Sequence, residues 1–138
     1  MFWALDLLTS FPDAYFVFVS RDPRDIVASL LRQWWGPSDV GSCIEYYRMR
    51  HHKWQQIRTE IHAQHLDSRL IEVRFEELVE KPVQTLDRIF DRFGLKPIRL
   101  SIDATRAHIG QWKTQFDDEQ RRQLNEELHH ELVECRYA

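Results

Sequence analysis

The stretch Tyr15-Phe-Val-Phe-Val19 is followed directly by Ser20-Arg-Asp-Pro-Arg-Asp25. The first part is a short run of aromatic and β-branched residues, which is typical of a strand buried on both faces of a parallel sheet. In the second part, Asp22 is placed to cap a helix, Pro23 to open it and Asp25 to lie in its first turn. We therefore expect a buried strand that passes directly into a helix.

The remaining elements surround this strand and helix. Leu70-Ile-Glu-Val-Arg-Phe75 alternates enough to form a second strand, and two strands separated by helices favour parallel pairing. Helices are predicted over residues 2–10, 23–35, 40–65, 82–93 and 118–132. Residues 76–81 are expected to turn, and residues 96–116 to form a loop with short helical pieces. The fold class is thus α/β, a short parallel sheet flanked by helices, in a single domain over residues 1–138.

One predicted helix has a clear buried side. The helix that Pro82 opens is expected to bury Val83, Leu86, Ile89, Phe90 and Phe93. Gly94 is well placed just beyond its end, where a residue with positive φ is common.

Composition narrows the function classes. The chain has 138 residues and a formal net charge of -3, which argues against a general nucleic-acid binder. No apolar run approaches the roughly 18 residues of a membrane span. Cys43 and Cys135 are too few for a secreted disulfide framework, so we expect reduced thiols in a cytoplasmic protein. The adjacent histidines 51–52 and 129–130 point in different directions on a helix, which makes them poor metal ligands, and no metal is expected.

The strand and helix also suggest a ligand. The strand delivers Arg21 to the carboxyl edge of the sheet, where ligands of open α/β sheets bind. A helix N-terminus suits phosphate, Arg21 can hold a phosphate with two parallel hydrogen bonds, and the hydroxyl of Ser29 could donate to the same anion. A well-capped, salt-bridged helix start explains the same residues, and spacing alone leaves both interpretations open.

The segment Ser20-Arg-Asp-Pro-Arg-Asp-Ile-Val-Ala-Ser29, with its lead-in from Phe11, resembles the 3′-phosphate-binding motif of PAPS-dependent sulfotransferases. PAPS is 3′-phosphoadenosine 5′-phosphosulfate. The resemblance implies a partial P-loop-NTPase-like fold and an enzyme that transfers a sulfo group from PAPS to an acceptor hydroxyl or amine, leaving PAP. It implies that Arg21 and Ser29 contact the 3′-phosphate. The acceptor would be a small molecule or a glycan.

Two further segments are similar to blocks of the same family. Val73-Arg-Phe-Glu-Glu-Leu-Val-Glu-Lys-Pro82 places Phe75 where the family often has a Tyr near the adenine, although a plain core residue is the alternative. Arg106-Ala-His-Ile-Gly-Gln-Trp-Lys113 resembles a late G-x-W block. There Arg106 matches a basic position, His108 either reaches the nucleotide or lies on the surface, and Trp112 is expected to be structural.

One part of the family pattern is not found. The turn that binds the 5′-phosphosulfate needs glycines and usually a Lys, but no glycine precedes Arg21 and the first lysine is Lys53. We therefore expect an N-terminally truncated member that carries the 3′-phosphate half of the donor site and does not catalyse transfer alone. No catalytic residue is assigned.

Other functions compete with this interpretation. A non-catalytic module that binds 3′,5′-ADP or a protein partner is the main alternative, followed by a generic protein-binding α/β domain. A P-loop kinase relative is disfavoured by the missing G-x-x-x-x-G-K-[ST] motif. A homo-oligomer is left open.

Overall fold

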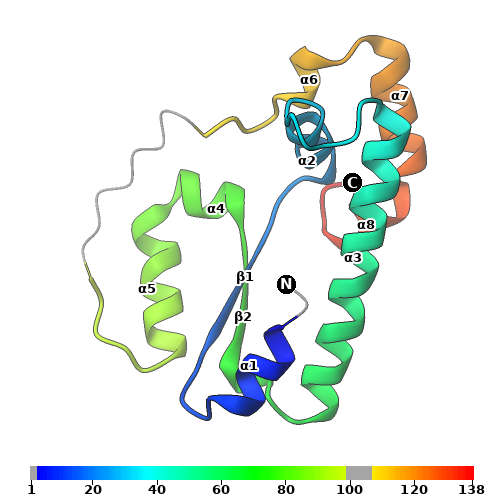
Figure 1. The fold of residues 1–138 in the computed structure, drawn as a ribbon. Coiled ribbons are helices and arrows are strands. Elements are labelled where there is room, and N and C mark those ends of the chain that lie inside the picture. The colour runs from blue at the N-terminus through cyan, green and yellow to red at the C-terminus, as the bar shows by residue number, and fades with distance from the viewer. Residues whose placement is uncertain (1–2, 99–106) are drawn as a thin grey trace. The chain divides into compact units, whose positions relative to one another are not determined.

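The computed structural model describes residues 3–98 and 107–138. Figure 1 shows its elements, which in chain order are α1 (Ala4–Ser10), β1 (Phe16–Ser20), α2 (Pro23–Leu30), α3 (Val40–Ala63), η1 (Asp67–Arg69), β2 (Leu70–Arg74), α4 (Phe75–Glu80), α5 (Pro82–Arg92), α6 (Trp112–Gln115), α7 (Asp118–Glu127) and α8 (His129–Glu134).

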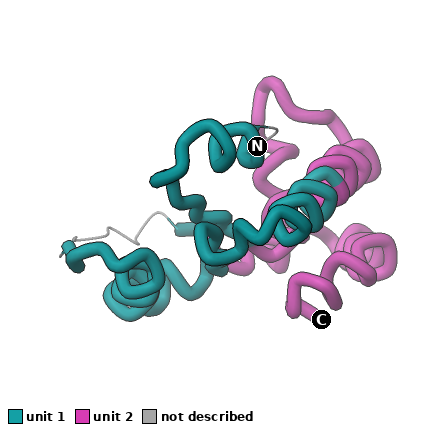
Figure 2. Tube along the Cα trace, turned by 90° about the horizontal axis from the view of Figure 1, so that it is seen from below, with its two compact units in different colours: residues 1–20, 53–107 teal, residues 21–52, 108–138 magenta. Residues whose placement is uncertain are grey.

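The chain divides into two compact units, which Figure 2 distinguishes by colour. Unit 1 comprises residues 1–20 and 53–107, and unit 2 comprises residues 21–52 and 108–138. The boundary between β1 and α2 therefore coincides with the boundary between the units, and α3 contributes residues to both.

Unit 1 contains the sheet. Strands β1 and β2 run parallel, in a register that pairs Phe16 with Leu70 and Ser20 with Arg74. Figure 1 shows the two strands side by side. The predicted α/β fold with a short parallel sheet flanked by helices is confirmed.

Aromatic side chains build the core of unit 1 on one face of β1. Phe18 stacks on Trp54 of α3 with ring centroids 3.7 Å apart and planes at 6°, and Phe16 lies beside the same ring. Leu8 of α1 and Ile61 of α3 are buried in the same cluster. Because alternate residues of a strand share a face, this cluster fixes which side of β1 is inward.

The prediction that β1 is buried on both faces is wrong. Val17 and Val19 point away from the aromatic cluster and are 40% and 46% exposed. Helices α4 and α5 pack against β2, where Val73 is buried, and leave this face of β1 open. A continuous apolar run was therefore a half-buried strand.

The helix after β1 is shorter than predicted. It ends at Leu30 instead of residue 35, and the chain then turns, with the N–H of Gln33 bound to the carbonyl of Leu30. A Cβ on Gly36 would lie 2.5 Å from the carbonyl oxygen of Leu30. The backbone thus folds back closely against the end of α2, which only glycine allows at that position.

The segment between β2 and Pro82 is helix α4 and not the expected turn. Glu76 and Glu77 lie in its first turn, where acidic side chains favour a helix. Pro82 then opens α5 as predicted, and Gly94 follows it with φ 64°. Val83 of α5 is exposed, which contradicts its predicted place on the buried side.

Unit 2 is a helical cluster. Val27 and Ala28 of α2 pack with Ile44 of α3, Trp112 of α6 and Leu124 of α7. The last predicted helix is two helices: α7 begins at an Asp117 capping box, and Leu128, with ψ 10°, separates it from α8. This core buries the apolar side chains of Val27, Ala28 and Leu30 of α2.

Candidate functional site

Helix α2 begins as the sequence predicts. The carboxylate of Asp22 accepts the N–H of Arg24 at 2.9 Å, and Pro23 occupies the first helical position. One anion, the carboxylate of Asp22, therefore already lies at the N-terminus of α2. A phosphate at this place would depend on side chains more than on the free N–H groups that the sequence led us to expect.

Arg21 lies between the last residue of β1 and the cap of α2. Its Nη2 donates to the carbonyl oxygen of His108 and lies 3.6 Å from the carboxylate of Asp25. The side chain remains 21% exposed. The guanidinium is thus anchored on the protein while part of it still faces solvent.

Ser29 lies one helical turn beyond Asp25. Residues four apart on a helix share a face, and the ion pair between Arg21 and Asp25 places Arg21 on that face too. Ser29 is half-buried, and its hydroxyl makes no hydrogen bond with the residues that the structure describes. Asp25 therefore connects the two positions, because it contacts Arg21 and shares a helix face with Ser29.

Asp25 connects these residues to a distant part of the chain. Its side chain is fully buried, and its two oxygens accept the N–H of Gly110 at 2.7 Å and the N–H of Trp112 at 3.0 Å. Gly110 has φ 71°, a conformation that glycine adopts without strain. The sequence placed Asp25 only as an acid of the first turn. Asp22 alone is enough to cap α2, so the presence of Asp25 in the same motif was a signal of another role that the sequence analysis did not use.

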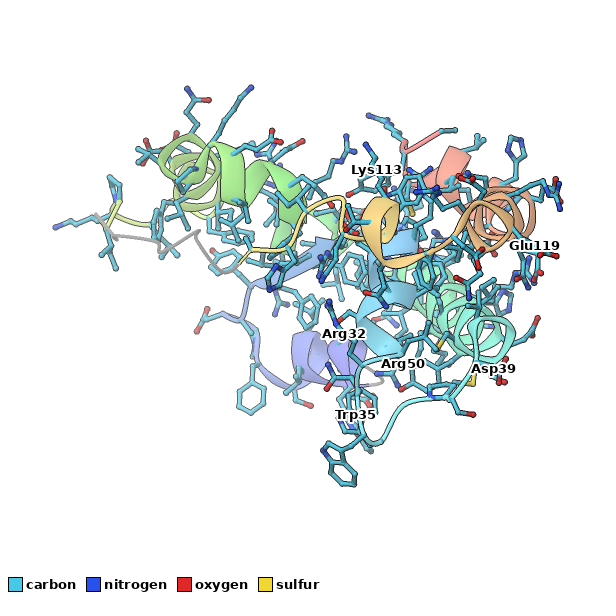
Figure 3. The ribbon with its side chains drawn as sticks, turned by 90° about the horizontal axis from the view of Figure 1, so that it is seen from above. Arg32, Trp35, Asp39, Arg50, Lys113 and Glu119 are labelled. Carbon is cyan, nitrogen blue, oxygen red and sulfur yellow. The ribbon has the colours of Figure 1, made fainter. Side chains whose placement is uncertain are left out.

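Trp112 is structural, as the sequence predicted. Its ring is buried in the core of unit 2, with Arg24 4.1 Å and Lys113 5.8 Å from the ring centroid; Lys113 is labelled in Figure 3. Arg24 also pairs with Asp22 at 2.8 Å and donates to the carbonyl of Tyr137 at 3.2 Å. The second arginine of the motif is therefore occupied in holding unit 2 together.

The remaining predicted residues are distributed differently. The backbone carbonyl of His108 meets Arg21, whereas its side chain is exposed. Phe75 is the first residue of α4 and half-buried, and it belongs to unit 1, whereas Arg21 and Ser29 belong to unit 2. Arg106 lies outside the described residues.

Comparison with protein families gives one match. A family model described as the sulfotransferase family matches residues 1–98, which is more than half of the chain. The chain belongs to the sulfotransferase family. No curated protein and no solved structure matches it. The matched part of this sulfotransferase-family chain contains Arg21, Ser29 and Phe75, whereas Arg106 and His108 follow it.

Within residues 3–98 and 107–138, no three His, Cys, Asp or Glu side chains are grouped as a metal ion needs. In the same ranges, no helix combines the length and the apolar character needed to cross a bilayer.

Proposed function

We propose that this chain binds PAPS by the 3′-phosphate of the nucleotide, with Arg21 and Ser29 as ligands, and that the sulfo group passes to an acceptor hydroxyl or amine. The nucleotide product is PAP. The observation that carries the proposal is that Asp25 contacts the guanidinium of Arg21 and shares a face of α2 with Ser29, one turn further on. Membership of the sulfotransferase family supports the reaction class.

The chemistry of Arg21 fits a phosphate ligand. A guanidinium presents paired donors to an oxyanion, and such charge-assisted bonds are about twice as strong as neutral ones. Arg21 uses Nη2 on the carbonyl of His108 and on Asp25, and these contacts limit the rotation of its side chain. A restrained donor loses less conformational entropy when it binds a ligand than a mobile one.

Ser29 adds a neutral donor to this charge. Ser29 is the seventh residue of α2, about 9 Å along the helix axis from Pro23 at a rise of about 1.5 Å per residue. The guanidinium of Arg21 reaches Asp25, one turn before Ser29, and a shared phosphate would bridge that remaining turn. The carboxylate of Asp25, buried beneath this face, is already satisfied by backbone N–H groups.

Three further residues complete the proposal, on the strength of the family resemblance. Phe75 would stack on the adenine, Arg106 would add positive charge at the 3′-phosphate, and His108 would reach the nucleotide. Residues 1–138 would act as one sulfotransferase domain, and its location would be the cytoplasm.

The proposal assigns the chain a binding and orienting role in the reaction. In sulfo transfer the acceptor atom attacks sulfur in line, loses its proton to a base, and the nucleotide leaves with the bridging oxygen. Holding the nucleotide by its far phosphate fixes the direction in which sulfur is presented. No side chain of this chain is assigned as the base.

Calorimetric titration with 3′,5′-ADP tests the proposal. The matched ligand is 5′-AMP, which lacks only the 3′-phosphate, and 2′,5′-ADP carries the same charge at a neighbouring position. We expect 3′,5′-ADP to bind at least tenfold more tightly than either, because a hydrogen bond to a charged group contributes about 1.5–3 kcal/mol. Equal affinity for 3′,5′-ADP and 5′-AMP would contradict the assignment.

A further inference from the structure

Asp25 is a buried charge with every oxygen engaged. Oδ2 accepts the N–H of Gly110 at 2.7 Å and lies 3.6 Å from Nη2 of Arg21, while Oδ1 accepts the N–H of Trp112 at 3.0 Å. Removing a carboxylate from water is costly, and burial is tolerated only when such partners replace the lost hydration.

The contacts of Asp25 close a ring with those of Arg21. Nη2 of Arg21 donates to the carbonyl of His108, two residues before Gly110. Asp25 therefore holds the N–H side of the segment 108–112, and Arg21 holds its carbonyl side. The guanidinium and the backbone segment are fixed by each other as well as by α2.

We infer that Asp25 is a positioning residue, which orients the guanidinium of Arg21 and the segment 108–112 for the phosphate that Arg21 binds. This inference rests on the proposed function for its ligand. Asp25 itself does not touch the anion, because two negative charges repel each other and its oxygens already have donors. Its effect on binding passes through Arg21.

A purely structural role makes a different prediction. If Asp25 only satisfied the amides of Gly110 and Trp112, its substitution would change 3′,5′-ADP affinity by the same factor whether or not the side chain of Arg21 is present. If it positions Arg21, its effect on binding depends on that side chain. A double-mutant cycle separates the two, since it measures the coupling directly.

Asp25→Asn is the primary variant, because it keeps the shape and removes the charge. We expect it to weaken binding of 3′,5′-ADP about tenfold in the wild-type background and less than twofold in Arg21→Ala. Affinity for 5′-AMP should not change. A loss of equal size in both backgrounds, or no loss in either, would overturn the inference.

Amide hydrogen exchange followed by NMR supplies a readout without ligand. In Asp25→Asn we expect the amides of Gly110 and Trp112 to exchange at least tenfold faster, while the buried residue Leu124 keeps its protection. Asp117→Asn is the matched control, because it alters an aspartate that caps α7 in the same unit. Unchanged exchange at Gly110 and Trp112 would contradict the conclusion that the carboxylate of Asp25 holds the segment 108–112.

Gly110→Ala provides a second route if Asp25→Asn does not fold. The added methyl would lie 4.0 Å from Cδ of Lys113, an ordinary van der Waals contact, but it disfavours the positive φ, so it loosens the segment from the other side. We expect the same dependence on Arg21. If the wild-type chain does not bind 3′,5′-ADP, both the proposed function and the effect of Asp25 on phosphate binding are refuted. The exchange experiment would still show whether Asp25 holds the segment 108–112.

Discussion

The guanidinium of Arg24 lies over the ring of Trp112, with its central carbon 4.1 Å from the ring centroid. The same side chain pairs with Asp22 at 2.8 Å and is largely buried. Arg21, three residues earlier, is anchored at the surface. The two arginines of the motif therefore have different surroundings: Arg24 holds unit 2 together, whereas Arg21 is the residue that we propose as a phosphate ligand.

Substituting each arginine by alanine should separate stability from binding. Arg24→Ala should lower the free energy of unfolding by about 2–3 kcal/mol, because it breaks a mostly buried ion pair and a cation–π contact. Arg21→Ala should reduce the ratio of 3′,5′-ADP to 5′-AMP affinity at least tenfold, whereas folded Arg24→Ala should keep that ratio. Urea denaturation and calorimetry provide the two measurements. An unchanged ratio in Arg21→Ala would contradict this division of tasks.

Ser29→Ala tests the neutral ligand. A hydrogen bond to a charged group contributes about 1.5–3 kcal/mol, so we expect a loss of about tenfold to a hundredfold in 3′,5′-ADP affinity. The smaller effect expected for 5′-AMP distinguishes a direct contact from a general disturbance of α2. Ser38→Ala, at an exposed position of the same unit, is the matched control and should bind like wild type. Equal affinities in the two variants would remove Ser29 from the site.

Local chemistry made much of the fold predictable. Asp22 is a capping residue and Pro23 suits the first helical position, so the two residue types predict where α2 starts. Gly94, with positive φ, predicts in the same way where α5 ends. The parallel pairing of β1 with β2 followed from the helix between two apolar runs. In each case neighbouring residues contain the determining interaction.

Features that depend on distant residues were not predictable. Asp25 meets Gly110 across 85 positions of the chain, and no local pattern encodes that contact. Val17 and Val19 are exposed because α4 and α5 pack against β2. The residues of β1 alone do not show where those helices pack. The break at Leu128 is similar, because the apolar period of α7 continues through it into α8.

Trp54 should be the most costly tryptophan to remove from unit 1. It is 2% exposed and stacks on Phe18, so Trp54→Ala should lower the free energy of unfolding by about 3–5 kcal/mol. Trp34 is 94% exposed, and Trp34→Ala should change stability by less than about 0.5 kcal/mol. Urea denaturation of both variants compares the same chemical deletion in two environments. Similar losses would mean that the aromatic stack on β1 does not stabilise the fold.

The start of α3 gives a prediction about pH. Asp39, labelled in Figure 3, accepts the N–H of Ser42 at 2.8 Å and its hydroxyl at 2.7 Å. These bonds, the N–H first, hold the pKa of Asp39 below its ordinary value of 3.8. A carboxyl whose pKa is lower in the folded state stabilises that state above its unfolded pKa. This contribution is lost as the pH falls through the lowered value.

Ser42→Ala removes the hydroxyl and keeps the N–H. We therefore expect the pKa of Asp39 to rise toward 3.8 without reaching it. Asp39 should then contribute less stability above pH 3.8, and the loss of that contribution on acidification should end at a higher pH. The carboxyl carbon shift of Asp39, followed by NMR between pH 2 and 6, gives the value directly. Ser38→Ala lies on the other side of Asp39 and should leave its pKa unchanged. If Ser42→Ala and wild type titrate alike, the backbone N–H alone sets the pKa, and the hydroxyl contributes nothing to the cap of α3.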